Sequence, residues 1–176
     1  PLDSFGQNIM YRAAARAYNV GAPYTTSLVI NHAVLGPVDQ SAIKWVHFDL
    51  KQGVGNPAAM VKSIVDEGSF APDSQSRWMG SMAIDQSGNI GLGYTRSSAT
   101  TNPAIMLSSR KLEDPAGELR DETACTPATT GSQTGNSGRW GDYSSMSVDP
   151  VDDCTFWHTN EYYSTSSSSS YRTRIC

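Results

Sequence analysis

The stretch "RWMGSMAIDQSGNIGLGY" (Arg77–Tyr94) decides the fold, because the chain repeats its plan further on. The stretch "RWGDYSSMSVDPVDDCTFW" (Arg139–Trp157) also begins with Arg-Trp, passes through a methionine to an aliphatic residue and an aspartate, and continues into a polar turn and an apolar run. The second stretch begins 62 residues after the first, and the same offset aligns Ala42–Leu50 with Ala104–Leu112. Agreement at several places along one period indicates a structural repeat.

Each period contains up to four short apolar runs separated by turn residues, which is the pattern of antiparallel strands. In the turn "DQSGN" (Asp85–Asn89), Gly and Asn tolerate the positive φ of a tight hairpin. Met82 and Met146 should then occupy equivalent places on the first strands of neighbouring blocks. The segment Ala13–Tyr18 also has the composition of a helix. We expect strands at 8–18, 26–34, 42–50 and 59–69, at 78–85, 89–95, 105–111 and 119–123, and at 141–149, 154–163 and 171–176.

Repeated blocks of four antiparallel strands are typical of β-propeller blades. A two-sheet sandwich also uses many short strands, but it gives no reason for repeated blocks of four. We therefore predict an all-β fold in which residues 1–176 form one propeller portion, with blades at about 8–70, 77–125 and 139–176. This portion holds about 2.75 blades, whereas propellers close with four to eight. The ring should accordingly be completed by blades from a parent chain, a second chain or a homo-oligomer.

The chain resembles the C-terminal blades of the sialidase-like (BNR or Asp-box) β-propellers of large secreted bacterial proteins. The two quoted stretches carry this resemblance, together with the hairpin "SRKLEDPAGEL" (Ser109–Leu119). That hairpin lies between the third and fourth strands of its block, where the family has an S-x-D-x-G-x-x-W turn, although the Trp and the Ser-x-Asp start are absent here. The resemblance implies a secreted, extracellular module.

Composition disfavours several classes of partner. The 176 residues carry a formal net charge of −4 and no basic stripe, so we expect no nucleic-acid partner and no anionic-membrane partner. No apolar run approaches the roughly 18 residues of a membrane span. Scarce lysine and abundant Ser, Thr, Gly, Asn and Tyr suit a secreted β protein. Since the sequence starts at Pro1 without a signal peptide, we expect a processed or excised piece whose targeting segment is not shown.

The repeated Arg-Trp pairs are candidate ligand-binding residues. In a propeller, the loop entering the first strand of each blade opens at one end of the central funnel, where Arg77-Trp78 and Arg139-Trp140 would lie, with Arg12 at a comparable place in the first block. Three guanidiniums around one axis would suit a carboxylate, because Arg offers paired donors in a fixed fork. The alternative is structural, with each Arg stacked on a Trp as a cation–π pair between blades.

The sialidase-like resemblance also implies catalytic candidates. In that family an arginine triad holds the sugar carboxylate and a tyrosine with a glutamate partner acts as nucleophile. Tyr143 would take the nucleophile's role, Glu161 would be its helper, and Asp142 lies beside Tyr143. The family's general-acid aspartate would lie in blades that this chain does not hold. Three functions follow as hypotheses: non-catalytic binding of a carbohydrate or protein, an exo-acting glycoside hydrolase of sialidase type, and a structural scaffold of a large extracellular protein.

Other polar residues have simpler interpretations. Asp85 and Asp149 should cap their own turns by accepting backbone hydrogen bonds. Three carboxylates gather in "DPVDD" (Asp149, Asp152, Asp153) and offer a possible Ca²⁺ site, although the ligand spacing of an EF-hand is absent. No Cys or His spacing predicts zinc, and no other metal or cofactor is expected. His32 and His158 should be packed between blades.

The three cysteines predict a disulfide. Folding the last hairpin about its midpoint places Cys154 opposite Cys176, where opposed residues of an antiparallel pair have the separation a disulfide needs. Such a bridge would add about 3 kcal/mol on the chain-entropy model. Cys125 is the rival partner, and three free buried thiols are the alternative.

Overall fold

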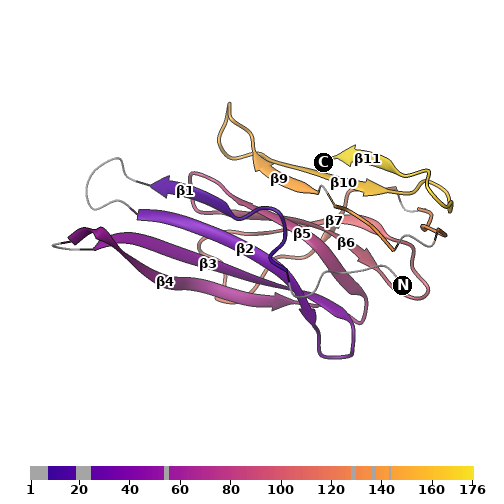
Figure 1. Cartoon of the computed structure of the whole chain (residues 1–176), viewed down its shortest axis with the longest axis horizontal. Helices are drawn as coiled ribbons and strands as arrows, with labels where there is room; N and C mark the ends of the chain where they lie inside the picture. The colour runs from indigo at the N-terminus through magenta and orange to yellow at the C-terminus, as the bar shows by residue number, and fades with distance from the viewer. Residues whose placement is uncertain (1–7, 19–24, 54–55, 128–129, 136–137, 143) are drawn as a thin grey trace.

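A computed structural model describes residues 8–18, 25–53, 56–127, 130–135, 138–142 and 144–176. Every regular element in these residues is a β-strand, and the strands form three separate antiparallel sheets (Figure 1). The prediction of an all-β fold is therefore confirmed. None of the three sheets closes into a barrel or ring.

Each sheet is built from consecutive strands in chain order. Sheet 1 contains β1 (Ala14–Tyr18), β2 (Thr25–Leu35), β3 (Ser41–Gly53) and β4 (Asn56–Phe70). Sheet 2 contains β5 (Ser76–Ile84), β6 (Ile90–Ser97), β7 (Ala104–Arg110) and β8 (Thr123–Ala124). Sheet 3 contains β9 (Ser145–Val148), β10 (Phe156–Tyr162) and β11 (Arg172–Ile175). Ten of the eleven expected strands are present, and Ala14–Tyr18 is a strand rather than a helix. The strand expected at 119–123 is wrong, because residues 119–122 are irregular and only the two-residue β8 (Thr123–Ala124) pairs with β7.

Sheet 2 is covered on both of its faces. Figure 1 shows it between sheet 1 and sheet 3, and β5 contacts β2 on one side and β9 on the other. Strands β5 and β6 are buried almost throughout, whereas β2 alternates between buried and partly exposed side chains. This difference follows from the layering, because a strand with one covered face buries every second residue and a strand with two covered faces buries nearly all of them.

Two apolar clusters hold the layers together. The larger one lies between sheets 1 and 2 and includes Trp45, Met82, Leu92 and Tyr94. The smaller one lies where sheets 2 and 3 meet, and consists of Met10, Trp78, Met79, Trp140 and Tyr163.

Glycines in β6 allow sheet 3 to approach sheet 2 closely. A Cβ atom at Gly91 would lie 2.6 Å from the Cδ1 of Phe156, and one at Gly93 would lie 2.2 Å from the Cγ of His158. Glycine inside a strand often marks such a close approach. The aromatic side chains of β10 therefore pack against the glycines of the "NIGLGY" run. His158 is fully buried there, as predicted.

The two Arg-Trp blocks share two features of position and backbone, although Arg77-Trp78 lies in β5 and Arg139-Trp140 precedes β9. Met82 and Met146 are both buried, on the first strands of sheets 2 and 3. The residue after each Trp adopts a left-handed conformation, with φ of 52° at Met79 and 64° at Gly141. Only glycine adopts this conformation without steric cost, so the repeat keeps the geometry even where the residue type changes.

The predicted Cys154–Cys176 disulfide is wrong. The bridge joins Cys125 to Cys176, and Cys154 is free and exposed. The reason is the register of the last hairpin, in which Thr159 lies opposite Ile175, so that Cys176 exchanges two 2.9 Å backbone hydrogen bonds with His158. Cys154 lies before β10 begins and never comes opposite Cys176. The bridge therefore ties the end of sheet 2 to the end of sheet 3.

Candidate functional site

Arg77 lies inside the protein, where its guanidinium forms ion pairs with neighbouring carboxylates. Its side chain is fully buried, 5.9 Å above the ring of Phe70. It donates to Asp73 at 2.6 Å and to both carboxylate oxygens of Glu122, at 2.8 and 3.1 Å. Glu122 also accepts hydrogen bonds from Tyr94 and Arg96. This arrangement favours the structural interpretation of Arg77, with Phe70 rather than a tryptophan under the cation.

The two tryptophans form an aromatic column between sheets 2 and 3. The ring centroids of Trp78 and Trp140 are 5.7 Å apart, and Tyr163 stacks on Trp140 at 5.3 Å. Both indole N–H groups have partners, Ser97 for Trp78 and Thr95 for Trp140. Because the column is buried, most of its surface is engaged within the protein.

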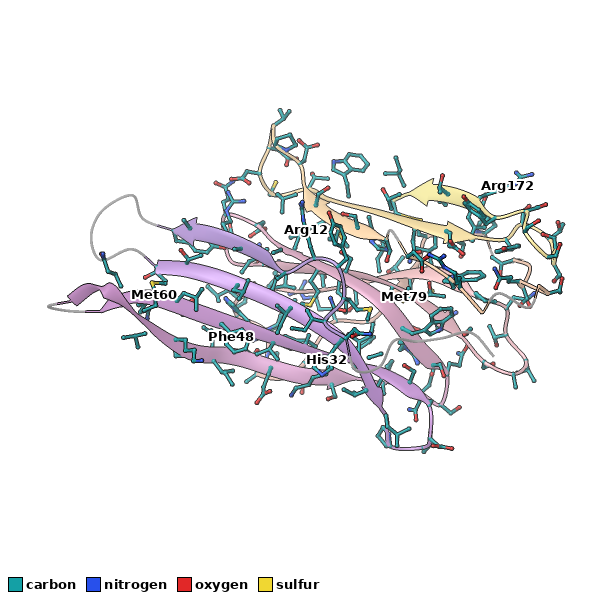
Figure 2. The ribbon with its side chains drawn as sticks, viewed as in Figure 1. Arg12, His32, Phe48, Met60, Met79 and Arg172 are labelled. Carbon is teal, nitrogen blue, oxygen red and sulfur yellow. A yellow bond between two sulfur atoms is a disulfide. The ribbon has the colours of Figure 1, made fainter. Side chains whose placement is uncertain are left out.

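The three predicted arginines are not brought together in one pocket. Arg139 is largely exposed and donates to Asp142, three residues further along the chain. Arg12 is exposed on the segment before β1 (Figure 2). Arg139 lines a pocket beside β10 and β11 of sheet 3, but Arg12 and Arg77 do not.

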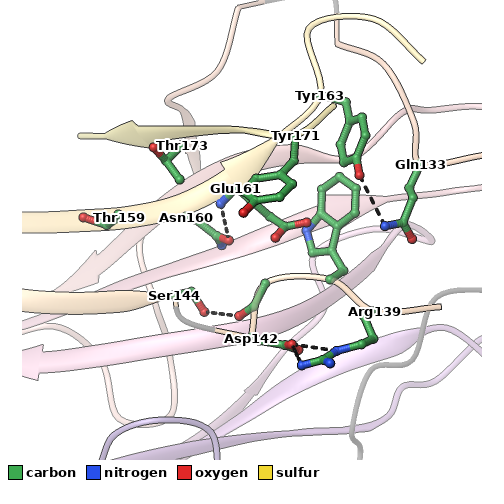
Figure 3. Close-up of a pocket in the computed structure, with 12 residues that line it drawn as sticks. Gln133, Arg139, Asp142, Ser144, Thr159, Asn160, Glu161, Tyr163, Tyr171 and Thr173 are labelled. Atoms are coloured by element: carbon green, nitrogen blue, oxygen red, sulfur yellow. Dashed lines mark hydrogen bonds and ion pairs between the residues drawn. The ribbon is translucent and has the colours of Figure 1, made fainter. Parts of the chain in front are cut away.

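A pocket of about 320 Å³ lies where residues 138–142 and Ser144 pass β10 and β11 of sheet 3 (Figure 3). Residues 138–142 contribute Arg139, Trp140 and Asp142 to its lining. Glu161 lies in the middle of the view, beside Tyr171 (Figure 3). The sequence-predicted residues Arg139, Trp140, Asp142 and Glu161 are thus brought together here, whereas Tyr143 lies outside the described residues.

Strand alternation explains how β10 and β11 build this surface. Thr159 and Glu161 are two residues apart on β10, so they point to the same face of sheet 3. Thr173 lies directly opposite Glu161 on β11 and shares that face. Tyr171, which is 60% exposed, enters the pocket from the turn just before β11. The pocket therefore combines an accessible aromatic ring with hydroxyl and carboxylate groups.

Two carboxylates give the pocket its electrostatic character. Burial raises the pKa of Glu161, the N–H of Gly141 opposes that rise, and the negative charge of Asp142 raises the pKa further. Asp142 is itself paired with Arg139. Among the described lining residues, the two carboxylates and one guanidinium leave a net charge of about −1 at neutral pH when all are ionised.

Asp85 and Asp149 cap their turns, as predicted. One oxygen of Asp85 accepts the backbone N–H groups of Ser87 and Asn89, at 2.8 and 2.9 Å. Asp149 accepts the N–H of Val151 at 2.7 Å and the indole N–H of Trp157 at 2.8 Å.

The other two carboxylates of the "DPVDD" segment also bond within the protein. Asp152 accepts the backbone N–H groups of Cys154 and Thr155, and Asp153 pairs with Arg16 of β1. Within the described ranges, no three His, Cys, Asp or Glu side chains are grouped so that they could hold a metal ion.

No protein-family model, curated protein or solved structure matches this chain. The described part of the chain contains no helix long and apolar enough to cross a membrane. The Cys125–Cys176 bridge is consistent with an extracellular location, since disulfides persist in oxidising compartments.

Sequence reasoning missed several residues of the pocket. Tyr171, Thr159 and Thr173 were not singled out, because their shared face depends on the register between β10 and β11. Glu122 was also missed, although it is the main partner of Arg77. Period-two alternation on β10 is the signal that could have paired Thr159 with Glu161.

Proposed function

We propose that this protein is a secreted module that binds carbohydrate without catalysis, at the pocket between residues 138–142 and sheet 3. The observation that carries the proposal is the convergence of Tyr171, Glu161, Thr159 and Asp142 on one concave surface. Binding pockets typically combine aromatic surface with a few placed polar groups. A sugar ring offers C–H groups that pack on an aromatic face and hydroxyls that pair with carboxylates and side-chain hydroxyls.

The proposal includes β-propeller architecture for the three sheets. Two observations support this architecture. Each sheet is antiparallel and built from consecutive strands, and the first strands of sheets 2 and 3, β5 and β9, are in contact. The disulfide supports secretion. In such a module, the candidate pocket would lie at the loop that enters the third blade.

Binding is tested with a glycan array followed by calorimetric titration of the best ligand. The variant Tyr171→Ala should weaken binding by about tenfold or more, because aromatic packing contributes on the order of 1 kcal/mol beyond its area. The matched control is Tyr11→Ala, since Tyr11 is 63% exposed and does not line the pocket. Absence of binding to any glycan, or equal losses in the two variants, would contradict the proposal.

A glycoside hydrolase is the second candidate, favoured by the raised pKa of Glu161 near Asp142. Glycosidases use a pair of carboxyl groups, one of which is kept protonated by its surroundings. Fluorogenic sialosides and neutral glycosides should be assayed with the wild-type chain and with the variant Glu161→Gln. Turnover by the wild-type chain that Glu161→Gln abolishes would favour the hydrolase over the binding module. The binding proposal expects the wild-type chain to show no turnover above that of the variant.

A further inference from the structure

The charges lining the pocket are unsuited to an acidic sugar. Among the described lining residues, Arg139 is the sole cationic side chain, and it donates to Asp142. Glu161 stands on β10 opposite Thr173, and its carboxylate accepts the backbone N–H of Gly141. A carboxylate ligand would be repelled by the negative charge of Glu161, and it would have to compete with Asp142 for the guanidinium of Arg139. Like charges placed together cost free energy, and more so in a partly desolvated site.

The remaining arginines of this region belong to another surface. Arg172 and Arg174 flank Thr173 on β11, and successive side chains of a strand point to opposite faces. Neither of them is among the residues that line the pocket. Neither arginine therefore offers a guanidinium donor to a ligand in the pocket.

Resting on the binding function proposed above, we infer that the pocket selects sugars that carry a free ammonium group, and that it discriminates against sugars that carry a carboxylate. The ammonium of an amino sugar would donate to the carboxylate of Glu161 while the sugar ring packs on Tyr171. Hydrogen bonds to charged groups contribute more than neutral ones, roughly 1.5–3 kcal/mol net. This corresponds to a preference of about tenfold or more over the neutral N-acetylated sugar.

Three probes test this inference by calorimetry on the whole chain: the disaccharide of glucosamine, its N,N′-diacetylated form and sialyllactose. The first two share a skeleton and differ in the charge of the amino group. We expect the amine to bind about tenfold or more tightly than its acetylated form, and sialyllactose to bind most weakly. Equal affinity for the first two probes, or tightest binding of sialyllactose, overturns the inference while leaving carbohydrate binding intact.

Charge-neutralising variants separate the role of Glu161 from the net charge of the protein. Glu161→Gln should reduce the preference for the amine to less than about threefold, which corresponds to losing most of one charged hydrogen bond. Glu113→Gln removes the same formal charge from a side chain that is 71% exposed and remote from the pocket lining, so it should leave the preference unchanged. Failure of all three probes to bind the wild-type chain would overturn the inference, whereas the function on which it rests is overturned only when no glycan of the array binds.

Discussion

Glu122 connects three polar side chains of sheet 2. It accepts hydrogen bonds from Arg77, Tyr94 and Arg96, and these bonds lower its pKa even though burial opposes the change. Arg77 is fully buried and has its second carboxylate partner in Asp73. A buried guanidinium is tolerated only when its partners are in place. Glu122 therefore stabilises the fold mainly as the bidentate partner of a buried guanidinium that Asp73 alone would satisfy only in part.

We predict that Glu122→Ala lowers the free energy of unfolding by about 1–3 kcal/mol, because Arg77 then stays buried with Asp73 as its one carboxylate partner. The measurement is urea unfolding at neutral pH. Glu113→Ala is the matched control: its carboxylate is exposed and lies 3.9 Å from Lys111, so its loss should change stability by less than about 0.5 kcal/mol. Similar effects of the two variants would show that the Arg77 network contributes little.

At the scale of elements, the positions of the strands could be predicted from the sequence. The contacts between residues of different elements could be predicted only in part. Alternation and turn residues located ten of the eleven strands, because those signals are local, whereas the strand expected at 119–123 is reduced to the two residues of β8. The bridge from Cys125 to Cys176 and the pairing of Arg77 with Glu122 depend on contacts between residues distant in sequence. The repeat suggested equal roles for Arg77 and Arg139, yet Asp142 follows Arg139 by three residues and keeps its guanidinium at the surface. Local patterns do not encode the two distant pairings, whereas the Arg139–Asp142 pair is itself a local signal.

The disulfide provides a test of how sheets 2 and 3 are joined. Cys176→Ser opens a loop with a sequence separation of 51 residues. The chain-entropy model gives a loss of about 4 kcal/mol for a loop of this length. Cys154→Ser removes an exposed thiol and is expected to leave the melting temperature unchanged. Non-reducing peptide mapping must show Cys125 linked to Cys176, and destabilisation by Cys154→Ser instead would contradict this connectivity.

The contact between β6 and β10 should make stability depend on pH. Burial against sheet 2 lowers the pKa of His158 from 6.5 to about 4. Between these values the unfolded chain binds the proton and the folded chain does not, so stability falls as pH decreases from 6.5 to 4, by up to about 3 kcal/mol. Replacing His158 with Phe should remove this part of the slope, measured by urea unfolding at several pH values. Part of the slope should remain, because burial also lowers the pKa of His47.

At the scale of the whole molecule, sheet 1 is covered on one face only. Val29, Ile43 and Trp45 point toward sheet 2, so Leu28 and Phe48 on the same strands point away from it. Ile64 lies opposite Phe48, and it is 56% exposed. Figure 2 labels Phe48 and Met60 along this sheet. Large exposed apolar faces in soluble proteins mark interaction sites.

We predict that the isolated chain associates through this outer face of sheet 1 rather than remaining a monomer at micromolar concentration. Burying apolar surface contributes about 25 cal/mol per Å², and a propeller portion would cover this face with another blade. Light scattering after size exclusion measures the mass. Ile64→Lys should yield a monomer, because it places a charge on the exposed apolar face beside Phe48. Val151→Lys is the control, since Val151 is 92% exposed on a turn of sheet 3 and should not affect association. A wild-type chain that is monomeric and melts cooperatively would instead favour a self-contained stack of three sheets, and the propeller proposal would be abandoned.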